Sequence, residues 1–188
     1  QIGFKGSFSK ADPDTPEFRL EEANPDLEGR LQKVTSPDKR VCLFNIYNMN
    51  SMFSLRRLEM RMAWDTCLAE YLRQQTNGLY AVVLGDLNAL RSLEPKDIHP
   101  SRAGPNRNDI PSLTDEERES FAKLIAHANL TFAEERRLLP RTKASPYTFY
   151  ADFGSKRKKM GFNLDYALVS SAAVGRVQTQ TLDSLGVD

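Results

Sequence analysis

The sequence predicts a layered α/β sandwich of the α/β (α+β) class, in which short strands alternate with two amphipathic helices. Residues 79–84 are a continuous apolar run of strand length, as is typical of a strand that is covered on both faces. Residues 55–75 and the segment that begins at Thr114 show helical spacing instead. With 188 residues, of which 40% are apolar and 27% are charged, the chain has the composition of one globular domain.

The first half of the chain predicts two strands, a long helix and a buried strand. Residues 30–34 and 41–47 are expected to pair across a turn at Ser36, Pro37 and Asp38. In the helix over residues 55–75, apolar residues recur at steps of three, four and seven, at Leu55, Leu58, Met62, Ala69 and Leu72. Asn77 and Gly78 end this helix, and the strand over 79–84 follows.

The second half begins with a polar loop that contains four prolines and continues into a second helix. Thr114 and Glu117 form the capping box that starts this helix. Its apolar stripe is expected at Phe121, Leu124, Ile125 and Ala128. Residues 147–150, 164–169 and 176–182 are further predicted strands.

Charge and cysteine content exclude several classes of protein. Twenty-six Lys and Arg against 25 Asp and Glu give a net charge of +1, which excludes a uniformly basic nucleic-acid-binding coat. The charges are unevenly spread, because residues 11–29 are strongly acidic and residues 136–160 are strongly basic.

No apolar run reaches the roughly 18 residues of a membrane span, so no membrane association is expected. Cys42 and Cys67 indicate neither a disulfide framework nor a zinc site, which favours a reducing, intracellular compartment.

Asp86 and Asn88 follow the buried strand and are the sharpest local candidates for chemistry. Residues two apart on a strand point to the same face, so both side chains are expected to reach one cleft. A carboxylate and an amide oxygen suit Mg²⁺. The alternative is that the two residues only cap the turn after the strand. No glycine-rich nucleotide loop or serine elbow is present, and His99 and His127 are interpreted as structural or surface residues.

Asp165 lies within an apolar alternating strand and is expected to be buried. A buried carboxylate needs a partner, which is either a histidine that it orients or an arginine in a structural ion pair. Aromatic residues flank the basic run over residues 156–159, a combination that can stack on bases while binding phosphate. The alternative is a solvated basic loop beside core aromatics, and a short basic run is also typical of a nuclear-localisation signal.

Taken in order, several short motifs resemble the exonuclease III-type apurinic/apyrimidinic (AP) endonucleases of the endonuclease/exonuclease/phosphatase superfamily. The motifs are GFKG at 3–6, EGR at 28–30, YNMN at 47–50, RLEMR at 57–61 with WD at 64–65, GDLN at 85–88, LTDEER at 113–118, YTFY at 147–150 and GFNLDY at 161–166. The resemblance implies a four-layer α/β sandwich, with two packed mixed β-sheets flanked by helices. It also implies Mg²⁺-dependent hydrolysis of DNA at abasic sites in base excision repair, with 3′-exonuclease or 3′-phosphodiesterase side activity and with Mn²⁺ as a substitute ion.

The resemblance also implies roles for individual residues. Tyr47 would stabilise charge on the scissile phosphate, Asp86 would orient or deprotonate the attacking water, and Asn88 would help to hold water and transition state. Asp165 would orient a catalytic histidine. The implied metal ligands are Asp86, Asn88 and Asp188. The implied DNA contacts are Asn50, Phe149, Phe162, Leu164, Lys156, Arg157 and Lys158. The implied partner is double-stranded DNA with abasic sites, bound by a monomer in the nucleus or mitochondrion of a eukaryote or the cytoplasm of a bacterium.

The chain departs from the family pattern inside the motifs and at both ends. Phe162 and Asn163 stand where the family has Trp and Arg, and Asn48 with Met49 replaces Val-Pro. The family's metal-binding glutamate would precede residue 1, and its catalytic histidine would follow Asp188. Residues 1–188 are therefore expected to be a partial domain that cleaves abasic DNA poorly. Two alternatives remain: a phosphodiesterase of the same superfamily acting on RNA, phosphoinositide or sphingomyelin, and a non-catalytic nucleic-acid-binding remnant.

Overall fold

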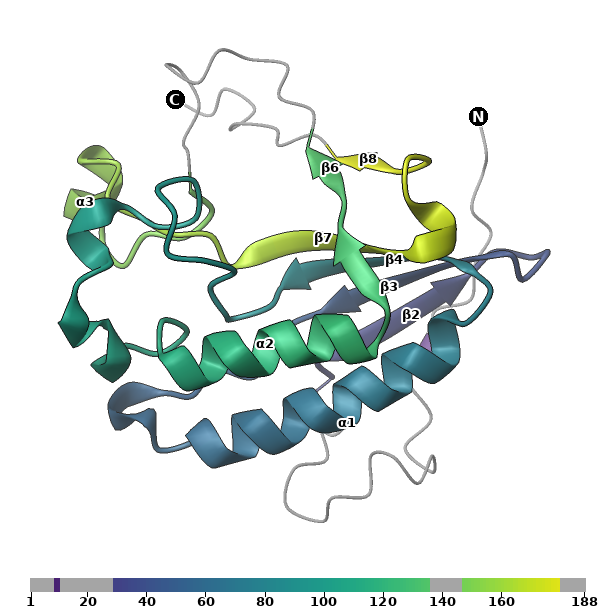
Figure 1. Ribbon diagram of the computed structural model, residues 1–188, viewed down its shortest axis with the longest axis horizontal. Coiled ribbons are helices and arrows are strands. Elements are labelled where there is room, and N and C mark those ends of the chain that lie inside the picture. Colours follow the sequence, from purple (N-terminus) through teal and green to yellow (C-terminus); the bar gives the residue numbers. More distant parts are fainter. Residues whose placement is uncertain (1–8, 11–28, 136–146, 180–188) are drawn as a thin grey trace.

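The computed structural model describes residues 9–10, 29–135 and 147–179, which contain both helices and strands (Figure 1). The strands are β1 (Ser9–Lys10), β2 (Leu31–Thr35), β3 (Val41–Ile46), β4 (Tyr80–Asp86), β5 (Leu130–Phe132), β6 (Glu134–Glu135), β7 (Asp165–Ser170) and β8 (Gln178–Thr179). The α-helices are α1 (Leu58–Thr76), α2 (Asp115–His127) and α3 (Phe153–Arg157). Short 3₁₀ turns lie at Phe53–Leu55, Pro100–Arg102, Pro105–Asp109 and Ser171–Ala173.

One mixed sheet forms the centre of the fold. Its six strands run in the order β1-β2-β3-β4-β7-β5, and β6 and β8 form a separate two-stranded parallel pair. Within the large sheet, β3 and β4 are parallel and the other neighbours are antiparallel. Because β4 lies between β3 and β7, the carboxyl ends of β3 and β4 and the start of β7 share one edge.

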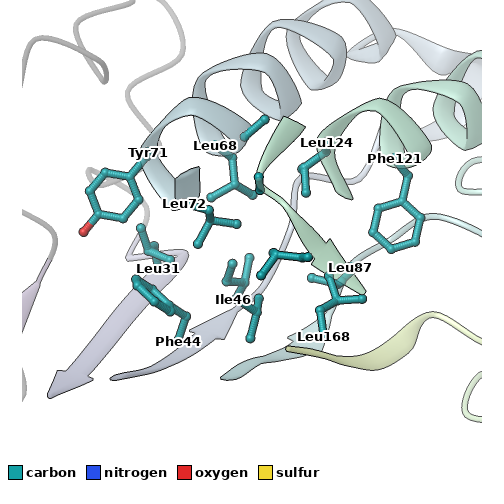
Figure 2. Packing of buried hydrophobic residues seen from close by; sticks show 14 of the residues in the cluster. Leu31, Phe44, Ile46, Leu68, Tyr71, Leu72, Leu87, Phe121, Leu124 and Leu168 are labelled. Atoms are coloured by element: carbon teal, nitrogen blue, oxygen red, sulfur yellow. The ribbon is translucent and has the colours of Figure 1, made fainter. Parts of the chain in front are cut away.

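Helices α1 and α2 lie side by side across one face of the sheet (Figure 1). The main core fills the space between them and the sheet, as Figure 2 shows for Phe44, Leu68, Leu72, Phe121 and Leu168. Alternate residues of the central strands face this core, and the register aligns Phe44 with Val83 and Val83 with Leu168. A second buried cluster forms under the long loop, from Leu90, Ile98, Leu113, Phe162 and Leu164.

The structure confirms most of the expected elements and corrects others. The strand pair β2–β3, the buried strand β4, the strand β7 and the capping box of α2 are all present, and the Thr114 Oγ1 accepts from the backbone N–H of Glu117. The predicted strand over residues 147–150 is wrong, because only an isolated bridge joins Phe149 to Phe162 there. Helix α1 begins at Leu58 rather than residue 55, since a 3₁₀ turn precedes it.

Several expectations fall on parts of the chain outside the described residues. These include the acidic segment up to residue 28, the motif at residues 3–6, the basic residues at 136–143 and Asp188. The strand expected over 176–182 is described only as β8. Among the helices that the structure describes, none has the length and apolar character needed to cross a membrane.

Candidate active site at one edge of the sheet

Two carboxylates meet at the shared edge of β3, β4 and β7. Asp86 is the last residue of β4, Asp165 is the first of β7, and the two are register partners. Directly opposed residues of an antiparallel pair project from the same face of a sheet. The two acidic groups that the sequence singled out on separate strands therefore lie next to each other.

Asp86 is half-buried, and its surroundings change its acidity. Burial raises the pKa of the Asp86 carboxyl, and the nearby charge of Asp165 raises it further. The backbone N–H of Asn88, which donates to Asp86 Oδ1 at 2.9 Å, and the charge of Arg61 act in the opposite direction. The contact from Asn88 is the turn-capping hydrogen bond expected as the alternative to a metal-binding pair.

The Asn88 side chain makes three hydrogen bonds that join neighbouring loops. Its Oδ1 accepts from Asn50 Nδ2 at 2.9 Å and from Ser112 Oγ at 3.2 Å, and its Nδ2 donates to the carbonyl of Asn48 at 2.9 Å. The side chain is buried, and the positive φ of 46° removes Asn88 from the strand alternation on which the shared-cleft expectation depended. The amide oxygen already accepts two hydrogen bonds, so this packing gives no support to a metal-binding role. That Asn88 binds a metal stays a prediction.

Tyr47 and Asn50 lie on the loop after β3, beside Asp86 at the end of β4. The backbone N–H of Asn48 donates to the carbonyl of Asp86 at 2.8 Å and joins the two segments. The Tyr47 ring is 56% exposed, and the Arg30 guanidinium carbon lies 5.0 Å from its centroid. The structure therefore brings an exposed phenol, an amide and two carboxylates to one edge.

Asp165 is exposed, so the expectation of a buried carboxylate is wrong. The reason is that β7 begins at this residue, where the sheet edge opens to solvent. Within the described residues no arginine pairs with it, and its backbone N–H donates to Thr148 Oγ1 at 3.2 Å. His99 bonds to Ser101 and His127 to Glu70, in keeping with their interpretation as structural or surface residues.

The aromatic residues expected to form a pocket differ in exposure. Phe149 and Phe162 pack with ring centroids 5.0 Å apart; the Phe149 side chain is 41% exposed, and those of Phe162 and Leu164 are buried. Phe162 therefore supports Phe149 from the second core, to which Leu164 also belongs, and the role of these residues as pocket walls stays a prediction. Asn163, at the position of the family arginine, donates from Nδ2 to the carbonyl of Lys96 at 2.9 Å and accepts from the N–H of Thr148 at 3.1 Å.

The basic run lies on α3 and directly after it. Lys156, Arg157 and Lys158 are exposed, and Asp152 caps the helix by accepting from the N–H of Ser155 at 2.7 Å. This exposure fits both a phosphate contact and a solvated loop, so DNA binding by these residues stays a prediction.

Two further residues near the site have no role predicted from the sequence, although Arg61 belongs to the motif at 57–61. Phe53 is 87% exposed in a 3₁₀ turn where Met52, Ser54 and Leu55 all have positive φ, and no sequence pattern marks this turn. Arg61 is completely buried, although the sequence suggests an apolar helix face there. Its spacing of four from Asp65 was the signal that could have revealed it.

The donor set for a divalent cation is incomplete within the described ranges. Asp86 and Asp165 offer carboxylate oxygens, the ligand type that Mg²⁺ prefers. No group of three or more His, Cys, Asp or Glu residues gathers there in a way that could hold a metal ion. The residues present therefore fit part of a Mg²⁺ site, and Asp188 lies outside the described ranges.

Comparisons with known proteins agree with the motif order. The model of the Endonuclease/Exonuclease/phosphatase family matches residues 8–188. An exodeoxyribonuclease of Bacillus subtilis is 25% identical over 99% of this chain and 72% of its own length. The recombination repair protein 1 of Drosophila melanogaster is 29% identical over 96% of this chain, which spans only 26% of that protein. The crystal structure of an AP endonuclease from Leishmania major superposes with a TM-score of 0.62 at 25% identity, covering 76% of this chain and 46% of that one.

Proposed function

Because the chain belongs to the endonuclease/exonuclease/phosphatase family, we propose that its protein hydrolyses phosphodiester bonds of DNA at abasic sites with the help of Mg²⁺. The observation that carries this proposal is the register pairing of Asp86 with Asp165 at an exposed sheet edge. The exodeoxyribonuclease and AP endonuclease relatives support DNA as the substrate. We also propose that the complete domain is a four-layer sandwich, which would cover the sheet face that α1 and α2 leave free.

In this proposal each residue acts through the position that the fold gives it. Asp86 orients or deprotonates the attacking water from the end of β4. The exposed Tyr47 hydroxyl stabilises charge on the scissile phosphate. Asp86 is a described residue that would hold Mg²⁺, and the ion, when bound, would neutralise developing negative charge. Asp165 would orient a catalytic histidine.

DNA is recognised in this proposal by residues around the same edge. Phe149 contacts the abasic sugar, Asn50 contacts phosphate, and the basic run at α3 contacts the backbone. One monomer binds one abasic duplex.

The decisive experiment compares substrates and metals with the full-length protein. A duplex with one tetrahydrofuran abasic site is expected to be cut 5′ to that site with Mg²⁺ or Mn²⁺, and to stay intact in EDTA. An undamaged duplex, single-stranded RNA and inositol phosphates serve as competing substrates. Faster hydrolysis of RNA or an inositol phosphate would assign the protein to another substrate class, and binding without cleavage would make it a non-catalytic remnant.

We predict that the basic run sets the salt dependence of DNA binding. The triple variant Lys156→Ala/Arg157→Ala/Lys158→Ala is expected to bind duplex DNA more weakly at low salt. Its log affinity should also fall less steeply with log salt, because the magnitude of the slope decreases by about 0.9 for each phosphate that is no longer neutralised. Fluorescence anisotropy between low and moderate salt measures both quantities. Lys123→Ala, an exposed lysine on α2, is the control and is expected to leave the slope unchanged. Equal slopes for the triple variant and the wild type would contradict the assignment.

A further inference from the structure

Arg61 is a buried arginine that contacts both loops of the candidate site. It lies on α1, and its side chain is fully excluded from solvent. Its Nη1 donates to the carbonyl of Met49 at 2.5 Å and to that of Asn88 at 2.8 Å, and its Nη2 donates to the carbonyl of Leu87 at 2.9 Å. One guanidinium thus binds the loop after β3 and the loop after β4 together.

Asp65 balances the buried charge and fixes the direction of the guanidinium. Both carboxylate oxygens of Asp65 lie 3.0 Å from Arg61 Nε. Asp65 Oδ1 also accepts from Asn48 Nδ2 at 3.1 Å, and Asn48 Oδ1 accepts from the Trp64 indole N–H. Each of these groups has a partner, as a buried polar network requires. The planar fork of arginine is suited to several acceptors at once, which a lysine ammonium cannot match in geometry.

A simple helix-stabilising ion pair would not explain this arrangement. The contact with Asp65 at i, i+4 would be satisfied by Nε alone, and buried ion pairs are weak evidence for stability. Three further donations from its Nη1 and Nη2 go to carbonyls within two residues of Asn50 or Asp86. The backbone carbonyls that accept from Arg61 therefore belong to the loops that contain or directly follow the proposed catalytic residues.

We propose that Arg61 is a positioning residue. It fixes the loop after β3, which carries Tyr47 and Asn50, relative to the end of β4 and its following loop, which carry Asp86 and Asn88. The side chains of the two segments can then act on the same phosphate. Its effect on turnover rests on the proposed function. Its effect on loop order does not, and it can be measured without substrate.

The test uses two variants and one control in the full-length protein. Arg61→Lys keeps the charge beside Asp65 but loses the fork, and Arg61→Met/Asp65→Asn removes both charges while keeping an acceptor for Asn48. Arg73→Lys, an exposed arginine on the same helix that pairs with Glu70, is the matched control. Hydrogen exchange by NMR is read at the amides of Asn48, Met49, Leu87 and Asn88, with those of Phe44 and Leu168 as core references.

Both Arg61 variants are expected to speed exchange about tenfold or more at the loop amides and to leave the core references unchanged. On abasic duplex, kcat is expected to fall about 10- to 100-fold with little change in KM, since displaced groups affect the transition state more than binding. Arg73→Lys should change neither readout.

The other outcomes separate this inference from the proposed function. If the wild type cuts no substrate while the loop amides of the variants exchange faster, the proposed function fails and loop positioning stands. If the wild type is active and both variants keep its kcat, or if exchange rises equally in loops and core, the positioning role is overturned. Global unfolding of both variants would also overturn it, because Arg61 would then hold the whole fold rather than two loops.

Discussion

Asp86→Asn is expected to lower kcat on abasic duplex DNA by about 10²- to 10⁴-fold without destabilising the fold, as for the loss of a general base. The amide keeps an oxygen that can accept the N–H of Asn88, so the turn after β4 is preserved. What is lost is the negative charge beside Asp165. Single-turnover cleavage measures the activity, and thermal unfolding of the same samples measures the stability.

The raised pKa of Asp86 fixes the sign of the stability change in metal-free buffer. A carboxyl whose pKa is higher in the folded state binds more protons in the folded than in the unfolded protein. The free energy of unfolding therefore falls as pH rises above the ordinary pKa near 3.8. Asp86→Asn removes this loss of stability, because the amide does not ionise. The melting temperature of Asp86→Asn is therefore expected to equal or exceed that of the wild type at pH 7, and the difference should shrink at acidic pH.

Asp38→Asn is the matched control, because Asp38 lies in the β2–β3 turn and has the opposite pH behaviour. The Ser36 hydroxyl and the backbone N–H of Arg40 lower the pKa of Asp38, so its stabilising contribution is present at neutral pH and disappears as pH falls. This variant should keep full activity and lose a little stability at pH 7. Wild-type turnover by Asp86→Asn would remove Asp86 from the proposed mechanism.

The sequence was most informative where a pattern is local. The capping residues Thr114 and Glu117, the apolar run of β4 and the turn at Ser36 each follow from neighbours in the chain, and the structure confirms them. These features depend on short-range periodicity and turn chemistry, which the sequence states directly.

The sequence was least informative where polar groups meet across the fold. Arg61 and Asp65 interrupt an apolar helix face, and their partners lie on loops far along the chain, so only the tertiary structure shows why they are buried. Asn88 is predicted to bind a metal, and the sequence does not show that Asn50 and Ser112 donate hydrogen bonds to its side-chain oxygen. Asp165 was expected to be buried, because the pattern does not show where a strand emerges at the sheet edge.

Gly85→Ala is expected to destabilise the protein by about 3–5 kcal/mol, at the upper end of single substitutions. A Cβ at Gly85 would lie 2.1 Å from the carbonyl oxygen of Ile46 on the neighbouring strand, and φ at this residue is +130°. Backbone strain of this kind amounts to about 1–3 kcal/mol, and the clash adds to it because the opposing atom belongs to the backbone of β3. Chemical denaturation of the variant measures the change.

Substitutions at two other glycines distinguish the cost of backbone strain from the cost of the steric clash. Gly78 has φ of +72° and no atom within 4 Å of the position that a Cβ would take, so Gly78→Ala should cost about 1 kcal/mol from conformation alone. Gly104 has φ of −68° and equally open surroundings, so Gly104→Ala should change stability by less than about 0.5 kcal/mol. If Gly85→Ala were no worse than Gly78→Ala, β3 and β4 would be able to separate locally. The strand pairing that places Asp86 beside the Tyr47 loop would then be looser than the structure shows.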